Sequence, residues 1–447
     1  MRLVLPQHIQ FIINRLNAAG FSAFAVGGCV RDSLLGKTPH DWDLATSATP
    51  TQVKETFSEL PVIDTGIRYG TVTLLIAKNS VEITTYRRED LYQDNRHPET
   101  IFFSTEIKED LARRDFTINA VAYHPELGLL DPFGGIHDLR KGILRAVGKS
   151  EERFQEDGLR ILRGLRFLAQ LGFIPDPQTA ASLRNCRFYL CNIAAERLEE
   201  ELTKLLLAPH VIPVLKNWHS VLGVFLPELE KIVGLAQNNP YHSYDVFIHT
   251  LKALEKTPKD KIIRYAVLFH DFGKADTKTT DEQGIDHFYH HPAISEQKAR
   301  AITARLRFPK RERTEICRLV KYHDVQIPCD SYHVKRWLNR FGEKFFRDLL
   351  LVKHADIYGQ NPTLRYRLDQ LSDYYFLLEK IKKEEQCFQL CDLAVNGKDL
   401  LDIGYQAGSE LGATLDEMLE LVMRQKLPNE KKALLNWASQ KNKKSSK

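Results

Sequence analysis

The sequence predicts an α+β protein in which a mixed α/β N-terminal part is followed by a chain that is helical to its end. Two observations carry this prediction. From about Phe21 to Leu144, short β-rich segments alternate with turns, whereas from Ser150 onward strand signals fade and helical periodicity dominates. Because 447 residues are too many for one hydrophobic core, we expect about two to four domains.

The composition argues against several classes of protein. No segment approaches the roughly 18 consecutive apolar residues of a transmembrane helix, so we expect no membrane association and a cytoplasmic location. The apolar N-terminal stretch is interrupted by polar residues, which favours an amphipathic helix over a secretory signal. Seven scattered cysteines without a Cys-x-x-Cys pair argue against a disulfide framework or a zinc knuckle. The net charge of +5 permits a nucleic-acid partner without requiring one, and no obligate protein partner is evident.

The densest group of functional signals lies between Val26 and Asp43, VGGCVRDSLLGKTPHDWD. A short strand is expected to end at Val26, followed by a turn at Gly27-Gly28 and a helix from Val30 to Leu35. Backbone N–H groups at such a turn can hold a phosphate, and Arg31 can add a bidentate contact. A lone Gly-Gly-x-x-Arg is more often only a turn.

Two aspartates follow this helix on a second predicted strand. Because side chains alternate along a strand, Asp41 and Asp43 point to the same face and Trp42 points away from them. Adjacent carboxylates repel unless cations lie between them, and Mg²⁺ is the natural occupant of such an oxygen site. A lone Asp-x-Asp is more often a solvated edge. Next to the glycine turn, however, it predicts a triphosphate cradle beside a metal pair, as nucleotidyl transfer requires.

A hairpin and a polar segment follow. Strands are predicted at 71–77 and 81–86, joined at 78–80. On the second strand, Glu82 is equally well interpreted as a third metal-binding carboxylate or as a solvated glutamate. The polar residues from Arg87 to Phe103 lack periodicity and predict a mobile loop, of the kind that often gates a site.

Arginines mark two further segments. Arg113 and Arg114 precede a helical pattern, where they could contact a nucleotide or form surface ion pairs. Farther along, Arg160, Arg163 and Arg166 recur every three residues, so they lie along one stripe of a predicted helix, and Asp157 begins that stripe. An acid and an arginine together can bind the edge of a base by hydrogen bonds. The alternative is a helix whose arginines pair with acidic neighbours.

Taken in order, these motifs resemble those of the bacterial-type (class II) tRNA nucleotidyltransferases, the CCA-adding enzymes, and of their relatives the bacterial poly(A) polymerases. The match is dense over residues 20–210 and returns weakly near the C-terminus. The residues that carry it are Gly27-Gly28-x-x-Arg31-Asp32, Asp41-Trp-Asp43-Leu-Ala-Thr, Arg113-Arg114-Asp115-Phe-Thr-Ile-Asn119-Ala, Asp131-Pro-Phe-Gly-Gly and Glu156-Asp157-x-x-Arg160. Trp42 departs from the smaller apolar residue expected in this family, which implies altered packing with unchanged chemistry.

The resemblance implies a head, neck, body and tail. The catalytic nucleotidyltransferase head is expected at 1–148 and a helical neck for nucleotide selection and RNA binding at 149–212. A helical body is expected at 213–345 and a helical, tRNA-binding tail at 346–447.

The resemblance also implies an activity and its residues. The family adds or repairs the 3′-terminal CCA of tRNA from CTP and ATP without a nucleic-acid template, and releases pyrophosphate. Asp41 and Asp43 would hold two Mg²⁺ ions, and the loop at 87–103 would assist the switch from C to A addition. The implied nucleotide-binding residues are Gly28, Arg31, Arg114, Asp157, Arg160, Arg163 and Arg166. The alternatives are an A-adding enzyme or poly(A) polymerase that uses ATP alone, and a phosphohydrolase of RNA ends.

That last alternative rests on a second resemblance, to HD domains. Phe269-His270-Asp271-Phe-Gly-Lys274 ends an apolar run. In such a domain His249, His270, Asp271 and Asp356 would bind a divalent metal, and His291 or His323 would assist hydrolysis. Histidine and carboxylate ligands accept several metals, so the sequence does not name one. The alternative is a retained fold that only grips tRNA.

Overall fold

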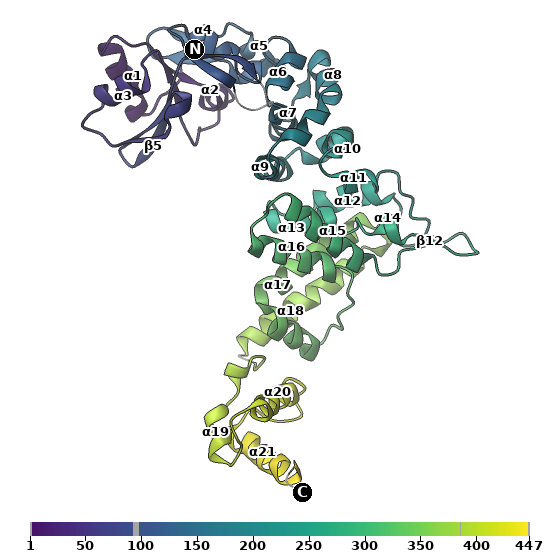
Figure 1. The fold of residues 1–447 in the computed structure, drawn as a ribbon. Coiled ribbons are helices and arrows are strands. Elements are labelled where there is room, and N and C mark those ends of the chain that lie inside the picture. Colours follow the sequence, from purple (N-terminus) through teal and green to yellow (C-terminus); the bar gives the residue numbers. More distant parts are fainter. Residues whose placement is uncertain (1, 93–97, 385, 446–447) are drawn as a thin grey trace. The chain divides into compact units, whose positions relative to one another are not determined.

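The computed structural model describes residues 2–92, 98–384 and 386–445 (Figure 1). The chain divides into two compact units. The first consists of residues 1–230 and 305–308, and the second of residues 231–304 and 309–447. This partition does not test the predicted head, neck, body and tail, which stay a prediction. Among the described helices, none combines the length and the apolar character needed to cross a bilayer.

The first unit begins with a seven-stranded mixed sheet in the order β3-β4-β5-β2-β1-β8-β9. Its central strands β2 and β5 are parallel, and the other neighbours pair antiparallel. The sheet and the helices that follow it confirm the predicted fold class. The strands are β1 (Ala23–Val26), β2 (Asp43–Thr46), β3 (Val62–Gly66), β4 (Thr71–Ile76), β5 (Asn79–Thr85), β8 (Ala122–His124) and β9 (Gly128–Leu130).

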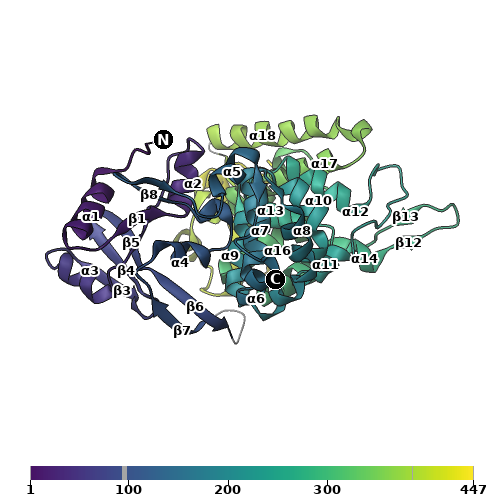
Figure 2. The same ribbon diagram turned by 90° about the horizontal axis from the view of Figure 1, so that it is seen from above.

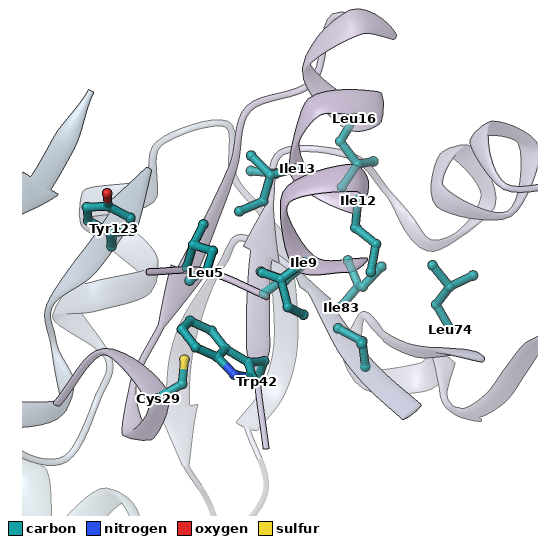
Figure 3. Packing of buried hydrophobic residues seen from close by; sticks show 14 of the residues in the cluster. Leu5, Ile9, Ile12, Ile13, Leu16, Cys29, Trp42, Leu74, Ile83 and Tyr123 are labelled. Carbon is teal, nitrogen blue, oxygen red and sulfur yellow. The ribbon is translucent and has the colours of Figure 1, made fainter. Parts of the chain in front are cut away.

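Helices α1 (Gln7–Ala18) and α3 (Pro50–Thr56) contribute to the main core of this sheet. In α1 the buried residues Ile9, Ile12, Ile13 and Leu16 follow the spacing of one helix face, as expected for an amphipathic helix. Figure 3 shows them packing in the same core as Trp42, which is 7% exposed. The predicted first helix is therefore confirmed, and Trp42 belongs to the core.

The predicted hairpin at 71–86 is confirmed. Strands β4 and β5 pair antiparallel, and the turn between them is at Ala77 and Lys78, whose φ angles are 49° and 65°. Two residues with positive φ are typical of the tight turns that match the twist of paired strands.

The predicted loop at 87–103 is wrong in its described parts. Strand β6 (Arg87–Tyr92) pairs antiparallel with β7 (Pro98–Phe103), and Figure 2 shows the two side by side. A two-stranded ribbon outside the main sheet is held by backbone hydrogen bonds, so it does not need the apolar alternation that the sequence lacks. Residues 93–97 lie outside the described residues, and the predicted mobility stays a prediction.

The rest of the first unit is mainly helical. A short parallel pair, β10 (Ile143–Leu144) and β11 (Ile174–Pro175), lies among the helices. The helices are α2 (Gly28–Leu34), α4 (Ile107–Ala112), α5 (Gly135–Lys141), α6 (Ser150–Glu156), α7 (Leu159–Leu171), α8 (Pro177–Asn185), α9 (Ala195–Leu206), α10 (Val211–Leu222) and α11 (Pro227–Glu230).

The second unit is helical apart from the two-residue strands β12 (Thr279–Thr280) and β13 (Asp286–His287). Its longest helix is kinked at Gly342, which has φ 81°. The last three helices lie together at the C-terminal end of the chain (Figure 1). A separate hydrophobic core joins them. The helices are α12 (Val246–Glu255), α13 (Lys261–Phe269), α14 (Lys274–Thr277), α15 (His291–Arg305), α16 (Lys310–Tyr322), α17 (Ser331–Gly359), α18 (Arg367–Lys383), α19 (Gly397–Asp402), α20 (Ser409–Met423) and α21 (Lys431–Ser445).

Candidate active site and a histidine–aspartate cluster

The glycine turn joins β1 directly to α2. Gly27 has φ 78°, which L side chains rarely adopt, and a Cβ atom there would lie 2.8 Å from Nη1 of Arg114. Gly27 is therefore required by the backbone conformation, and the end of the Arg114 side chain lies close beside it. The predicted strand, turn and helix are confirmed, with the helix beginning at Gly28.

The two aspartates lie at the start of β2. Asp43 is the first residue of the strand and Asp41 precedes it, and both are exposed while Trp42 between them is buried. The predicted alternation therefore continues into the residues before the strand. Glu82 on β5 is the parallel register partner of Asp43 and is also exposed.

These carboxylates repel one another. Desolvation of the Asp43 carboxylate, with repulsion from Glu82 and Asp41, raises its pKa above the ordinary value of an aspartate, although the charge of Arg114 opposes this shift. A set of oxygen donors whose negative charges destabilise one another fits a divalent cation such as Mg²⁺. Glu82 is thus placed as a third carboxylate beside the predicted pair.

A cleft of about 550 Å³ lies in the first unit. All seven predicted nucleotide-binding residues line it, together with Asp43, whereas Asp41 is outside the lining. The seven are Gly28, Arg31, Arg114, Asp157, Arg160, Arg163 and Arg166. The fold therefore brings together residues that lie up to 138 positions apart in the sequence, from Gly28 to Arg166. Their individual roles stay predictions.

The arginines at the glycine turn are held by polar side chains. Nη1 of Arg31 donates to Oδ1 of Asn119 at 2.8 Å, and its Nε donates to Asp32 at 2.9 Å. Nη2 of Arg114 donates to the buried carboxylate of Asp110 at 3.1 Å. These contacts fix the guanidinium groups before any ligand arrives.

Asp115 is the most deeply buried acid of the cleft. It accepts hydrogen bonds from Nε and Nη2 of Arg163, at 2.9 and 2.6 Å, and from Nδ2 of Asn119 at 3.0 Å. Although burial opposes ionisation, the Arg163 guanidinium holds the pKa of Asp115 well below its usual range. Asp115 therefore stays charged and positions Arg163.

The other two arginines of the stripe also have acidic neighbours. Arg160 pairs with Glu156 and donates to the backbone carbonyl of Arg113 at 2.9 Å, and Nε of Arg166 lies 2.9 Å from Glu201. All three arginines of the stripe therefore pair with acidic residues, as the alternative interpretation of the sequence expected. Pairing does not remove the guanidiniums from the cleft, which all three of them line.

The prediction that Asp157 shares one helical stripe with the three arginines is wrong, because Asp157 lies outside their helix. Helix α6 ends at Glu156 and α7 begins at Leu159, with Asp157 in an extended conformation between them. A Cβ atom on Gly158 would lie 2.7 Å from the carbonyl oxygen of Tyr189, so the chain turns where only glycine fits. The Asp157 carboxylate accepts from the backbone N–H of Leu159 at 3.0 Å and from Arg197 at 3.1 Å.

Several residues of the cleft received no role from the sequence, among them Asn119, Phe167 and Arg197. Asn119 connects Arg31 to Asp115, and Arg197 reaches Asp157 from α9. Phe167 has the guanidinium carbons of Arg31 and Arg166 at 5.1 and 4.3 Å from its ring centroid. Asn119 and Phe167 adjoin motif residues and could have been found by that proximity, whereas Arg197 carries no signal in the sequence.

The second unit contains a cluster of buried histidines and aspartates. His249 lies on α12, His270-Asp271 at the end of α13, and Asp356 on α17. Nε2 of His249 lies 3.1 Å from Nε2 of His270, 3.1 Å from Oδ1 of Asp356 and 3.4 Å from Oδ2 of Asp271. The four residues predicted as metal ligands are therefore adjacent in space.

Both histidines that were predicted to assist hydrolysis are also in this cluster. Nε2 of His291 lies 3.3 Å from Oδ1 of Asp271 and 3.3 Å from Nε2 of His323. Although burial opposes it, Asp271 and Asp356 raise the pKa of His270 to about 10, whereas burial and the neighbouring imidazoles lower the pKa of His323 to about 3. Buried carboxylates here require a positive charge among the imidazoles. The donor set fits a divalent metal.

Comparisons with known proteins agree with this arrangement. The family described as "Poly A polymerase head domain" matches residues 23–145. The family described as "Probable RNA and SrmB- binding site of polymerase A" matches residues 172–232, and "tRNA nucleotidyltransferase domain 2 putative" matches residues 277–438. With the cleft, these matches indicate a nucleotidyltransferase.

Similarity over the whole chain is more specific. A CCA-adding enzyme of Lactiplantibacillus plantarum is 33% identical over 438 residues, which cover 97% of both chains. A CCA-adding enzyme of Leuconostoc mesenteroides is 48% identical over 206 residues, or 45% of this chain and 51% of the relative. The chain belongs to the CCA-adding enzyme family.

Solved structures show the same fold. The Bacillus stearothermophilus CCA-adding enzyme in complex with CTP superposes with a TM-score of 0.74 at 26% identity, over 99% of both chains. The Thermotoga maritima CCA-adding enzyme complexed with tRNA_CCA has a TM-score of 0.59 at 20% identity, over 97% of this chain and 95% of that one. The second likeness concerns the fold alone.

Proposed function

We propose that the protein adds or repairs the 3′-terminal CCA of tRNA, using CTP and ATP and releasing pyrophosphate. The observation that carries the proposal is the cleft of the first unit, where the carboxylate Asp43 and an array of positioned arginines face one space. Full-length similarity to a CCA-adding enzyme supports this activity over an A-adding enzyme or a poly(A) polymerase. Because its substrate is tRNA, we place the protein in the cytoplasm.

The chemistry is a transfer between two oxygen atoms. The 3′-hydroxyl of tRNA gives up its proton to solvent as its oxygen attacks the α-phosphorus of the nucleotide. The bond from that phosphorus to the oxygen that bridges the α- and β-phosphates breaks, and pyrophosphate leaves with the bridging oxygen. Asp41 and Asp43 would hold Mg²⁺, with Glu82 beside them, and the bound metal would lower the pKa of the attacking hydroxyl and neutralise the leaving group. No covalent enzyme intermediate is involved.

The arginines bind and orient the triphosphate. The backbone at Gly28 and the guanidinium of Arg31 would contact the phosphates, and Arg114 the sugar and phosphates. The fact that all three line one cleft supports these roles. Arg163 and Arg166, steadied by Asp115 and Glu201, supply positive charge along the nucleotide. Because these groups are held before binding, little conformational entropy is lost when the nucleotide arrives.

Base selection is assigned to Asp157 and Arg160. The carboxylate of Asp157 accepts hydrogen bonds and Arg160 donates them, so the pair matches the polar edge of cytosine or adenine. In this structure Asp157 pairs with Arg197, and Arg160 pairs with Glu156. A base would therefore have to replace the hydrogen bonds that Asp157 and Arg160 already make. Only a base whose own donors and acceptors match their positions would do so, and this would be the source of selection.

Transcript extension tests the function. Three tRNA transcripts, ending before CCA, after C and after CC, are incubated with each nucleotide singly in Mg²⁺. We expect C on the first two transcripts with CTP, and A on the third with ATP. Extension of the third transcript alone would indicate an A-adding enzyme, and long ATP-only tails a poly(A) polymerase.

A second function is favoured by the histidine–aspartate cluster. We propose that His249, His270, Asp271 and Asp356 bind a divalent metal and that the site hydrolyses phosphoesters at RNA ends. The supporting observation concerns three of these residues, His249, His270 and Asp271, which are buried. Their ligand atoms all lie within 4.8 Å of one another. Metal content after desalting tests the metal, and loss of phosphate from 3′-phosphorylated RNA tests the activity. If His270→Gln retains all the metal of the unaltered protein, the site assignment is wrong.

A further inference from the structure

We infer that Phe167 is a positioning residue of the nucleotide cleft, whose ring holds the guanidiniums of three arginines together by cation–π attraction. The three are Arg31, Arg163 and Arg166. The inference rests on the proposed nucleotide-binding function of this cleft and assigns it a further residue. The ligand that the arrangement serves is a nucleoside triphosphate, because its phosphates are anions that adjacent guanidiniums can bind together.

The ring of Phe167 is held by buried packing. Phe167 lies on α7 and lines the cleft, although only 3% of it is exposed. It packs against the fully buried ring of Phe116, with 5.8 Å between the ring centroids and 82° between the ring planes. Aromatic pairs favour this edge-to-face arrangement. The orientation of the ring is therefore fixed independently of any ligand.

Three guanidinium carbons lie within about 6 Å of the ring centroid, which is the range of cation–π attraction. The carbon of Arg166 is at 4.3 Å, that of Arg31 at 5.1 Å and that of Arg163 at 5.7 Å. Arg163 and Arg166 belong to α7 itself, whereas Arg31 belongs to α2. The ring is thus a place where the arginine of the glycine turn and the arginine stripe meet.

The three guanidiniums repel one another. Desolvation lowers the pKa of Arg166 below the ordinary value of an arginine, and the charges of Arg163 and Arg31 lower it further. The carboxylates of Glu201 and Asp115 oppose this shift. A group of like charges keeps its arrangement only if attractive contacts offset the repulsion, and the ring supplies such contacts.

Hydrogen bonds hold the three guanidiniums unequally. Arg163 and Arg31 each donate to neighbouring side chains, at distances between 2.6 and 2.9 Å. Nε of Arg166 lies 2.9 Å from Oε2 of Glu201, but neither atom has a hydrogen-bond partner among the described residues. Arg166 is also the closest of the three to the ring. The ring therefore supports the guanidinium that lacks an aligned hydrogen bond at Nε.

An aromatic ring suits this place better than a further carboxylate would. A carboxylate would neutralise one guanidinium, whereas a ring attracts guanidiniums through its quadrupole and leaves their net charge unchanged. The positive charge therefore stays available for the triphosphate. Because guanidiniums that are positioned in advance lose little freedom when the ligand binds, the ring should increase the affinity for the nucleotide.

The test weakens the quadrupole of the ring and keeps its shape. Phe167 is replaced in the full chain by phenylalanines that carry one, two or three fluorine atoms, which progressively withdraw electron density from the ring. Titration calorimetry then measures the dissociation constants of CTP and of ATP in Mg²⁺, without tRNA. We expect the logarithm of each constant to rise with each fluorine, to a total increase of about tenfold.

Fluorination of Phe154 is the matched control. This buried phenylalanine of α6 also packs against Phe116, with ring centroids 6.4 Å apart, but it is not among the described residues that line the cleft. The same three replacements there should leave both dissociation constants unchanged.

Ordinary substitutions extend the series. Phe167→Leu, which removes the ring, should weaken nucleotide binding by about tenfold, whereas Phe167→Tyr, which keeps the ring, should preserve it. Thermal melting identifies any variant that fails to fold. The fluorine series tests the inference even if the leucine variant does not fold, because fluorine hardly changes the volume of the side chain.

The outcomes are distinguishable. Dissociation constants that stay the same or fall along the Phe167 series would overturn the inference and leave the proposed function standing. An equal rise in the Phe154 series would also overturn it, because the effect would then come from packing and not from the guanidinium charges. If the unaltered protein bound neither nucleotide, both the inference and the proposed function would be wrong.

Discussion

The nucleotide cleft and the histidine–aspartate cluster hold charge in opposite ways. In the cleft, permanently charged guanidiniums line a space of about 550 Å³, and internal acids such as Asp115 and Glu201 hold them in place. In the cluster, titratable imidazoles and carboxylates are buried against one another. The first arrangement stays charged and suits a large anion that enters and leaves. The second needs protons or metal ions to be stable, and suits an ion that remains.

Both the cleft and the cluster must offset the cost of burying charged groups, and they do so in different ways. A buried charge must be paired, because desolvation costs several kcal/mol for each ion. The cleft meets this cost with pairs formed inside the protein, so its arginines are ready before the nucleotide binds. In the cluster, the proposed cation would meet this cost. Four changes to the first unit would break or sharpen this contrast.

The largest effect is expected for Asp43→Ala. Removal of a proposed metal ligand takes away transition-state charge stabilisation, and we expect nucleotide transfer to fall by about 10³-fold or more with little change in thermal stability. Single-turnover addition of C to a transcript lacking CCA measures the rate. Asp64→Ala, which removes an exposed carboxylate of the same sheet, is the control and should retain near-normal transfer.

Trp42→Ala should lower thermal stability and leave nucleotide transfer intact, which is the reverse of the effect expected for Asp43→Ala. The neighbouring side chain faces the core, so truncation should cost about 3–5 kcal/mol of stability while transfer persists at low temperature. Thermal melting and the same transfer assay measure the two quantities. If Trp42→Ala abolished transfer without lowering stability, the assignment of opposite roles to the two faces of β2 would be wrong.

Asp115→Asn tests the internal pairing of the cleft. Leaving Arg163 without its buried partner should cost about 3 kcal/mol at neutral pH. Because the pKa of Asp115 is lowered in the folded state, its stabilisation is present above its unfolded pKa of about 3.9 and is lost as pH falls through the lower folded value.

The variant should therefore lose less stability than the unaltered protein as pH falls below about 4. Thermal melting over a pH series checks this, with Asp64→Ala again as the control. Identical slopes for the Asp115 variant and the unaltered protein would contradict the pairing.

The smallest effect is expected for Asp157→Asn. Exchange of one acceptor oxygen for a donor should reduce discrimination between CTP or ATP and the other nucleotides by about 10–100-fold, because one well-placed base contact contributes about 1–3 kcal/mol. Competition assays with nucleotide pairs measure the ratio. Glu200→Gln on α9, which is exposed and pairs with Lys204, provides a control. Unchanged discrimination would remove Asp157 from base selection.

Local patterns predicted much of the first unit. The sequence from Val26 to Asp43 contained its own turn residues and alternation, so the strand, helix and second strand could be inferred from neighbours in the chain. The polar ribbon of β6 and β7 could not, because backbone pairing leaves no periodic signal. The break between α6 and α7 was missed because the arginine spacing gave no sign of the contact between Gly158 and Tyr189.

Long-range pairing explains the remaining differences in both sites. The acids that hold Arg163 and Arg166 are 48 and 35 residues away, and no spacing rule connects Asp115 or Glu201 with them. In the cluster, the sequence identified the ligand types but not their grouping. Only the packing of five helices shows that His291 and His323 face the second oxygen of Asp271.

The central claim is tested most directly by one transcript that ends before CCA, incubated with CTP and ATP together in Mg²⁺ and sized at single-nucleotide resolution. The account predicts addition of three nucleotides, C, C and A, followed by a stop, and no product with Asp43→Ala. A ladder of long tails, or an unextended transcript with the unaltered protein, would contradict it.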